Sequence, residues 1–258
     1  MLGAIAGDVI GSSYEHNPIK TIDFELFTDA TTFTDDTVLT VATAFSLLTD
    51  GDYAENYRIF GRLYPMAGYG SSFGKWLSGG DPAPYGSWGN GSAMRVAPVG
   101  WAFDTVDEVL AEAERSAAVT HDHPEGIKGA QAVALGVFMA RQGASSADIC
   151  DEITSRFGYD LDRTVDGVRP NYEFDISCQG SVPEAFLCFR EGGDWLDGVR
   201  LAVSLGGDAD TQACIAGALG EAAGRVIPEE VERQVRPKLP THLLEVVADF
   251  MTRFMRAP

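Results

Sequence analysis

The sequence predicts an all-α protein, a compact helical bundle. Long stretches repeat apolar residues with a period near 3.6, several of them are rich in small residues, and alternating runs typical of strands are sparse. Hydrophobic residues make up 45% and charged residues 22% of the chain, as is usual for a globular protein. At 258 residues without a linker-like change in composition, we expect one domain spanning residues 1–258.

The helical elements can be justified in chain order. Gly3, Gly7 and Gly11 recur every fourth residue, which predicts a buried N-terminal helix packed closely against another helix. Residues 105–118 place a stripe of apolar side chains on one face. The same rhythm predicts helices at 127–141, 211–226 and 242–255.

Two segments interrupt this pattern. Residues 64–92 are rich in Gly, Ser, Pro and aromatic residues, and residues 158–177 are polar with Pro170 in the middle. We expect both to be irregular. Long irregular loops inside a compact domain are uncommon and often functional.

The charge and cysteine content exclude several classes of protein. A formal net charge of −19 argues against a general nucleic-acid or anionic-membrane surface, both of which need Lys and Arg. An anionic ligand would need positive charge from bound cations. The four cysteines form no CxxC pair and resemble reduced core residues. No signal-peptide pattern or membrane-length apolar stretch occurs, so we expect a cytoplasmic protein, and without a heptad seam a monomer.

The segment FTDDTVLTVATAF, residues 33–45, begins a predicted helix with doubled charge. Thr34 or Asp35 could act as an ordinary N-cap, and acidic residues in the first turn complement the helix dipole. One aspartate would satisfy that need, so Asp36 is a surplus that a cap alone does not explain.

A second cluster of the same kind lies near the other end of the chain. Asp208, Asp210 and Thr211 open another helix of small residues after a Gly-Gly pair. Magnesium and manganese ions prefer oxygen ligands such as carboxylates. Two such clusters facing each other could hold two divalent cations, Mg²⁺ or Mn²⁺, roughly 3.5–4 Å apart. The structural alternative to a metal site is that the two clusters are ordinary helix caps that carry doubled charge by chance.

Other polar residues stand in or beside apolar segments. Glu15 follows GDVIGSSY, Ser87 and Asn90 lie among glycines in GSWGNGS, and His121 precedes the helix at 127–141. Each has an ordinary structural alternative. Glu15 could be a solvated helix end, the glycine-rich stretch a plain turn, and His121 a capping or packed histidine.

Taken in order, these segments resemble the ADP-ribosylglycohydrolase family, of the dinitrogenase reductase-activating glycohydrolase type. The stretches that carry the resemblance are GAIAGDVIGSSYE, FTDDT, GYGSS, GSWGNGSAMRVAPVG, THDHP, SVPEAF and SLGGDADTQACIAGALGEAAG. The resemblance implies the compact all-α fold of that family, a binuclear Mg²⁺ or Mn²⁺ centre, and hydrolysis of the C1″ glycosidic bond of ADP-ribose conjugates. The partner it implies is an ADP-ribosylated protein or a small ADP-ribose conjugate.

The resemblance also assigns expected roles to residues. The metal ligands would be Thr34, Asp35, Asp36, Asp208, Asp210 and Thr211. Glu15, with the metal-binding Asp35 and Asp36, would serve catalysis by positioning or activating the attacking water. The substrate-binding residues would be Gly70 and Ser71 around the phosphates, Ser87, Gly89 and Asn90 around the ribose, and His121.

One position departs from part of the family. Arginine-directed members tend to carry Asp three residues before the Asn-Gly pair, where this chain has Ser87, which is more like members that cleave serine- or oxygen-linked conjugates. Two other functions stay open at this point: an ADP-ribose-binding module without turnover, and a binuclear phosphoesterase acting on nucleotides.

Overall fold

The structure is a computed structural model that describes residues 1–81 and 83–255. Pro82, in the segment expected to be irregular, and residues 256–258 of the expected domain lie outside the described residues. Helices dominate, and within the described ranges the only β-type pairing is one isolated bridge between Gly89 and Ser177. The predicted all-α class is confirmed.

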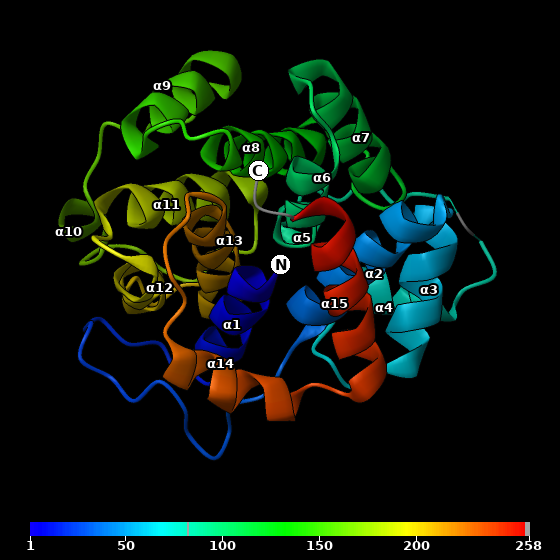
Figure 1. The fold of residues 1–258 in the computed structure, drawn as a ribbon, viewed down its shortest axis with the longest axis horizontal. Coiled ribbons are helices and arrows are strands. Elements are labelled where there is room, and N and C mark those ends of the chain that lie inside the picture. Colours follow the sequence, from blue (N-terminus) through cyan, green and yellow to red (C-terminus); the bar gives the residue numbers. More distant parts are fainter. Residues whose placement is uncertain (82, 256–258) are drawn as a thin grey trace.

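The helices α1 to α15 and one 3₁₀ turn follow one another along the chain (Figure 1). Their bounds are α1 Leu2–Gly11, α2 Asp35–Thr49, α3 Tyr53–Leu63, α4 Ser71–Ser78, α5 Gly91–Met94, α6 Ala97–Ala102, α7 Val106–Ala118, α8 Pro124–Arg141, α9 Ser146–Phe157, α10 Val165–Val168, α11 Cys178–Glu191, α12 Trp195–Ser204, α13 Ala209–Ala222, α14 Glu229–Val235, η1 Arg236–Lys238 and α15 Thr241–Phe254.

The first helix, α1, lies beside α13 at the centre of the molecule (Figure 1). The predicted glycine repeat makes this approach possible. A Cβ atom added to Gly7 would lie 2.0 Å from the carbonyl oxygen of Ala213, and one added to Gly3 would lie 2.4 Å from that of Gly217. Any larger residue would therefore force the two helices apart.

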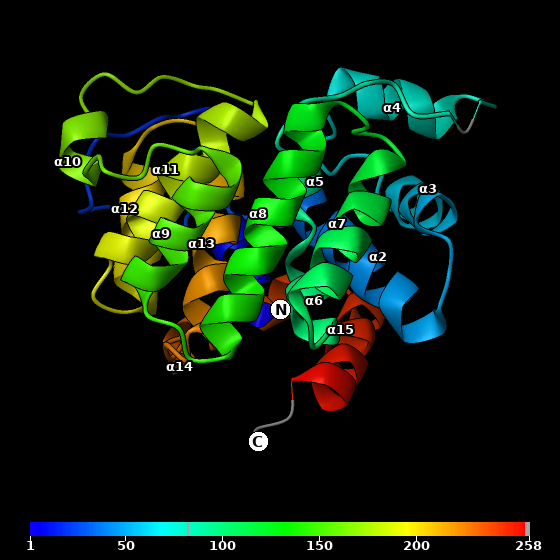
Figure 2. The same ribbon diagram turned by 90° about the horizontal axis from the view of Figure 1, so that it is seen from above.

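Helices on either side of this central pair form two groups. Helices α9 to α12 lie on one side and α2, α3, α4 and α15 on the other, with α8 between them, as both views show (Figures 1 and 2). This packing brings together the starts of α2 and α13. The hydrogen bond from Thr211 in α13 to Asp36 in α2 joins residues 175 positions apart in the chain.

Several predicted helix boundaries shift by a few residues. The helices expected at 105–118 and 242–255 correspond to α7 and α15. The one expected at 127–141 begins earlier, at Pro124, because the His123 side chain accepts the Glu125 N–H as an N-cap and proline suits the first turn. The one expected at 211–226 ends at Ala222, before Gly224 adopts φ 75°.

The prediction of an irregular segment at 64–92 was partly wrong. Residues Ser71–Ser78 form α4, because Phe73, Trp76 and Leu77 share one helix face and are buried. The Leu77 side chain packs against Gly61 of α3. Sequence reasoning missed this helix because its glycines and serines are typical of loops.

Two smaller differences concern the site. The N-terminal helix ends at Gly11, so Glu15 lies in the turn that follows and not at the helix end. The segment 158–177 is irregular as expected, apart from the single turn of α10. All four cysteines are free and buried, as expected. Across the described ranges, none of the helices has the length and apolar character needed to cross a bilayer.

Candidate metal and ligand site

The starts of α2 and α13 open onto one cavity of about 250 Å³. Five carboxylates line it, all of them singled out by the sequence: Glu15, Asp35, Asp36, Asp208 and Asp210. The fold therefore gathers negative charge from three separate parts of the chain around one cavity.

The start of α2 is held from below by a carboxylate of α1. Asp8 is fully buried and accepts bonds from the backbone and the hydroxyl of Thr34, at 3.0 and 2.7 Å, and from the backbone N–H of Thr37 at 3.1 Å. The Thr37 hydroxyl donates to it as well. Thr34 is also the N-cap, since its hydroxyl oxygen accepts the Asp36 N–H at 3.3 Å.

Sequence reasoning missed Asp8, although a signal was present. It is the one charged residue of the otherwise apolar helix LGAIAGDVIG. A carboxylate in such a helix must find partners, because burying an unpaired charge is costly. Its four donors fix Thr34 and the first turn of α2, so Asp8 determines how Asp35 and Asp36 are presented.

The start of α13 is held differently. Asp208 is its N-cap residue but makes no side-chain cap bond, and its Oδ2 instead accepts the Asn90 amide at 2.7 Å. The backbone reaches it through Gly206, which has φ 64°, a conformation that favours glycine. The Thr211 N–H donates to Asp210 Oδ1 at 2.9 Å.

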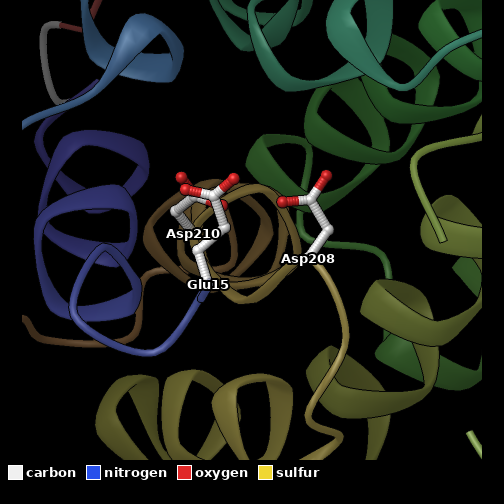
Figure 3. A group of neighbouring side chains, drawn as sticks. All are labelled: Glu15, Asp208 and Asp210. Carbon is white, nitrogen blue, oxygen red and sulfur yellow. The ribbon is translucent and has the colours of Figure 1, made fainter. Parts of the chain in front are cut away.

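The two clusters lie within hydrogen-bond reach of each other. The Thr211 hydroxyl donates to Asp36 Oδ2 at 3.3 Å across the gap between α13 and α2. Carboxylate oxygens of Glu15, Asp208 and Asp210 all lie within 4.8 Å of one another. Figure 3 shows these three side chains pointing toward a common space at the end of α13.

Without a bound cation, the negative charges of these buried carboxylates repel one another. Burial raises the pKa of Asp35 and Asp36 well above the ordinary aspartate value, and the nearby charge of Asp8 raises each of them further. Burial and then the charge of Asp208 raise the pKa of Asp210 well above that value, and the same two causes raise the pKa of Glu15. Carboxylates this close resist ionising together unless a positive charge lies between them.

The residues present fit a divalent cation. Asp36 Oδ1 is buried and has no hydrogen-bond partner among the described residues, so one acceptor facing this region has no protein donor. The available donors are carboxylate and hydroxyl oxygens, which hard cations such as Mg²⁺ and Mn²⁺ prefer. A bound cation would reverse the local pKa shifts by compensating the crowded negative charge.

The structure brings the expected ligand-binding residues to the same cavity. Its lining includes Gly70, Ser71, Ser87, Gly89, Asn90 and His121, together with Thr211. Thr34 is the exception among the described residues that were singled out, because it does not line the cavity and its hydroxyl proton is given to Asp8.

Other cavity residues were missed by sequence reasoning. They are Leu39, Gly68, Ser72, Phe73, Tyr85, Gly91, Met94, Arg95 and Ile176. Most are apolar or small and carry no chemical signal in the sequence. Arg95 is different, because it is the one Lys or Arg side chain in the described lining of the cavity, and it is completely buried.

Comparison with known proteins identifies the family of the chain. The family model for ADP-ribosylglycohydrolase matches residues 1–257. The chain belongs to the ADP-ribosylglycohydrolase family. Among solved structures, an ADP-ribosylglycohydrolase-related protein complex superposes with a TM-score of 0.74 at 26% identity, covering 97% of this chain and 95% of that one.

Two relatives show how far the similarity in sequence extends. ADP-ribosylhydrolase ARH3 from Homo sapiens is 32% identical over 185 residues, which cover 57% of this chain and 50% of the relative. An uncharacterised protein of Archaeoglobus fulgidus is 34% identical over 176 residues, or 60% of this chain and 58% of that protein. The chain thus spans about half the length of these curated relatives, 50% of one and 58% of the other.

Proposed function

We propose that this protein hydrolyses the C1″ glycosidic bond of ADP-ribose conjugates and that it does so with two divalent cations, Mg²⁺ or Mn²⁺. The observation that carries the proposal is the convergence of two clusters of oxygen ligands on one cavity, bridged by the bond from Thr211 to Asp36. Family membership and the similarity to ARH3 support the choice of ADP-ribose conjugates as substrates.

The two clusters would divide the ligands between them. One cation would be held by the α2 start with Thr34, Asp35 and Asp36, and the other by the α13 start with Asp208, Asp210 and Thr211. Bound there, the cations would orient the ribose hydroxyls and make a nearby water more acidic. Thr34 can contribute only an oxygen lone pair, because its proton is engaged by Asp8.

Glu15 is the residue we propose to guide water to C1″. It is half-buried, lines the cavity, and lies beside Asp208 and Asp210. Burial and the charge of Asp208 raise its pKa in the metal-free protein, and bound cations beside it would lower that pKa again, which suits a carboxylate that accepts a proton. Its carboxylate would be able to accept a proton from water, since within the described part of the chain its one ion pair is with the exposed His16 at 3.7 Å.

The loops opposite the carboxylates would hold the rest of the ligand. Ser71 begins α4 and no side chain caps it, so free N–H groups at this helix start can face the diphosphate. Gly89 and Asn90 would border the ribose, with the Asn90 amide already fixed on Asp208. Oriented amides together with cations would explain how a strongly acidic protein binds an anionic nucleotide.

The acceptor linked to ADP-ribose is proposed from one position. Ser87 lines the cavity, and its hydroxyl accepts the Gly89 N–H at 3.2 Å. A neutral side chain here lacks the charge that would favour a cationic guanidinium acceptor. We therefore propose serine-linked or other oxygen-linked ADP-ribose, on a protein or a small molecule, as the preferred substrate.

The first test removes one carboxylate from each cluster. In Asp36→Ala and Asp210→Ala, metal content and release of ADP-ribose from serine-, arginine- and O-acetyl-linked conjugates should fall together. The matched control is Asp151→Ala, which removes an exposed carboxylate on α9 and should change neither. Full turnover by a variant that has lost its metal would contradict the proposal.

The same panel separates this function from its alternatives. Tight binding of ADP-ribose without release from any conjugate would indicate a binding module. Release of inorganic phosphate from nucleotides would indicate a phosphoesterase. The absence of histidine from both clusters argues against the second alternative, because the carboxylates and threonines form them alone.

A further inference from the structure

Beside the carboxylates, a chain of three polar side chains runs from the core to the cavity. Arg95 is completely buried, and its Nη2 donates to Thr120 Oγ1 at 2.9 Å and to the Ser116 carbonyl at 3.0 Å. Thr120 Oγ1 lies 2.8 Å from Nδ1 of His121. His121 in turn lines the cavity.

The position of the Arg95 side chain is fixed by contacts in the core, so that it can in turn orient Thr120 and His121. Its guanidinium carbon lies 4.1 Å from the ring centre of Tyr57, a cation–π contact inside the core. The Tyr57 hydroxyl is itself fixed, at 2.8 Å from the Ser116 hydroxyl and 2.9 Å from the Thr43 hydroxyl. Among the described residues, no carboxylate forms an ion pair with Arg95. Its positive charge is therefore not neutralised and acts on Thr120 and on the cavity wall.

The direction of each bond in the chain follows from the chemistry of its members. Arginine only donates, so the Thr120 oxygen must accept from it. Thr120 Oγ1 also lies within hydrogen-bond distance of His121 Nδ1, and Tyr85 is close enough to Thr120 to interact with it. Burial raises the pKa of Tyr85 to about 12, so this phenol keeps its proton. The single Thr120 proton is then left for Nδ1, which is a better acceptor than a phenol oxygen.

We propose that Arg95 and Thr120 are positioning residues that fix His121 as the tautomer with its proton on Nε2, so that it presents one N–H donor to the ligand. The proposal rests on the function proposed above for the identity of the ligand. The tautomer itself depends only on the three side chains and on Tyr85.

The location of Nε2 agrees with a donor aimed into the cavity. It has no protein hydrogen-bond partner among the described residues, and it faces the loop around Gly89 and Gly91. A Cβ added to Gly91 would lie 3.1 Å from Nε2, so only glycine leaves this edge of the ring free. The ring is also flanked by Tyr85, whose ring centre lies 6.0 Å away.

His121 is expected to stay neutral while it does this. Burial first, and then the positive charge of Arg95, lower its pKa well below the ordinary histidine value. A neutral imidazole with Nδ1 already occupied donates through Nε2 and can no longer accept there. The ligand atom it recognises is therefore an oxygen acceptor, either on the diphosphate or on the terminal ribose.

The decisive measurement is the tautomer of His121 by ¹⁵N NMR of histidine-labelled protein without ligand. The His121→Gln spectrum identifies its signals among the four histidines of the chain. We expect a protonated Nε2 and an unprotonated Nδ1 in the wild type and in Thr120→Ser. In Thr120→Val the preference should be lost. A wild-type ring protonated on Nδ1 would overturn the proposal, whatever the enzymatic activity proves to be.

Binding measurements then test what the fixed donor does. Thr120→Val should weaken ADP-ribose binding about tenfold, the effect of losing one well-placed hydrogen bond, and Thr120→Ser should restore it. A matching loss for ADP places the acceptor on the diphosphate side, and a loss for ADP-ribose alone places it on the terminal ribose. Equal affinity of the Val and Ser variants for both ligands would overturn the proposed role in binding.

The other end of the chain can be tested in the same way. In Arg95→Gln the new amide can accept as well as donate, so Thr120 is no longer forced to give its proton to Nδ1. We expect a mixture of the two tautomers in this variant. An unchanged, single Nε2–H tautomer would remove Arg95 from the proposal and leave Thr120 alone. The Thr120 pair decides the question if Arg95→Gln fails to fold.

Discussion

The starts of α2 and α13 use the same residue types, yet they are built in different ways. At α2, Thr34 caps the helix and Asp8 holds the first turn from below through four donors. At α13, Asp208 makes no cap bond, and its carboxylate is held from the side by Asn90. One cluster is therefore fixed by the core of the protein, and the other by a loop of the cavity.

This difference indicates how the two halves of the site obtain their shape. The carboxylates at α2 inherit their position from α1, which is locked against α13 by glycine contacts. The carboxylates at α13 face Glu15 and one another, so their arrangement depends more on a bound cation that compensates their charge. We expect disruption at α2 to cost stability, and disruption at α13 to cost mainly binding and turnover.

The largest effect on stability is expected for Asp8→Ala. Four buried donors lose their acceptor. At ~1 kcal/mol or more for each, unfolding should become easier by about 4 kcal/mol in total. That corresponds to a fall in melting temperature of roughly 8–16 °C for a domain of this size, measured by calorimetry. The Asp8→Asn variant keeps the volume and one acceptor oxygen, so its melting temperature should lie between those of the wild type and of Asp8→Ala. A melting temperature within a degree of the wild type would show that Asp8 does not hold α2.

A smaller free-energy effect, seen in turnover and not in folding, is expected for Glu15→Gln. The substitution removes the proposed proton acceptor beside Asp208 but keeps its shape. Turnover should fall by ~100-fold, the usual scale for a general base, with ADP-ribose affinity nearly unchanged. Steady-state kinetics and calorimetric titration measure the two quantities. Unchanged turnover would remove Glu15 from the catalytic residues.

Metal removal should make stability depend on pH in a defined direction. In the metal-free protein the pKa values of Asp35, Asp36 and Asp210 are raised in the folded state, so their contribution is present at acid pH, below the ordinary aspartate pKa, and is lost as pH rises through the raised values. Melting temperature after chelation should therefore fall from about pH 4 toward pH 8 relative to the metal-loaded protein.

Added Mg²⁺ or Mn²⁺ should restore that lost stability. At a cation concentration 100 times Kd the gain is ~2.7 kcal/mol for one site, or roughly 5–10 °C, and it should be larger at pH 8 than at pH 5. The melting temperature of chelated, metal-free samples at both pH values supplies the baseline. An equal or larger gain at pH 5 would contradict a cation held by these carboxylates.

The smallest change in stability is expected for Asn90→Ala. The substitution removes the donor to Asp208, whose carboxylate lines the cavity and can bond to water instead, and the donor to the Ser181 hydroxyl, which still bonds to the Asp175 carbonyl. We expect a loss of ~1 kcal/mol, or about 2–4 °C. The affinity for ADP-ribose should fall more clearly than stability does, since Asn90 is a proposed ribose contact. A stability loss as large as that of Asp8→Ala would remove the contrast between the two helix starts.

Much of the fold could be predicted from periodicity. The segments that became α7, α8, α13 and α15 were found within a few residues, because a regular apolar repeat survives in any tertiary context. The helix α4 was missed because its composition is that of a loop, and only burial of Phe73, Trp76 and Leu77 against α3 makes it helical. Glu15 was placed at a helix end, four residues beyond the true end of α1 at Gly11.

Local patterns in the chain, TDD and DADT, account for which oxygen ligands are available and for the start of a helix at each cluster. Their meeting, with Thr211 bonded to Asp36, depends on how α1, α2 and α13 pack, which no local pattern contains. The same is true of Asp8 beneath α2 and of the path from Arg95 through Thr120 to His121. Apart from the contact between the neighbours Thr120 and His121, these contacts join residues at least 25 positions apart in the chain, so tertiary packing selects which buried polar groups become partners.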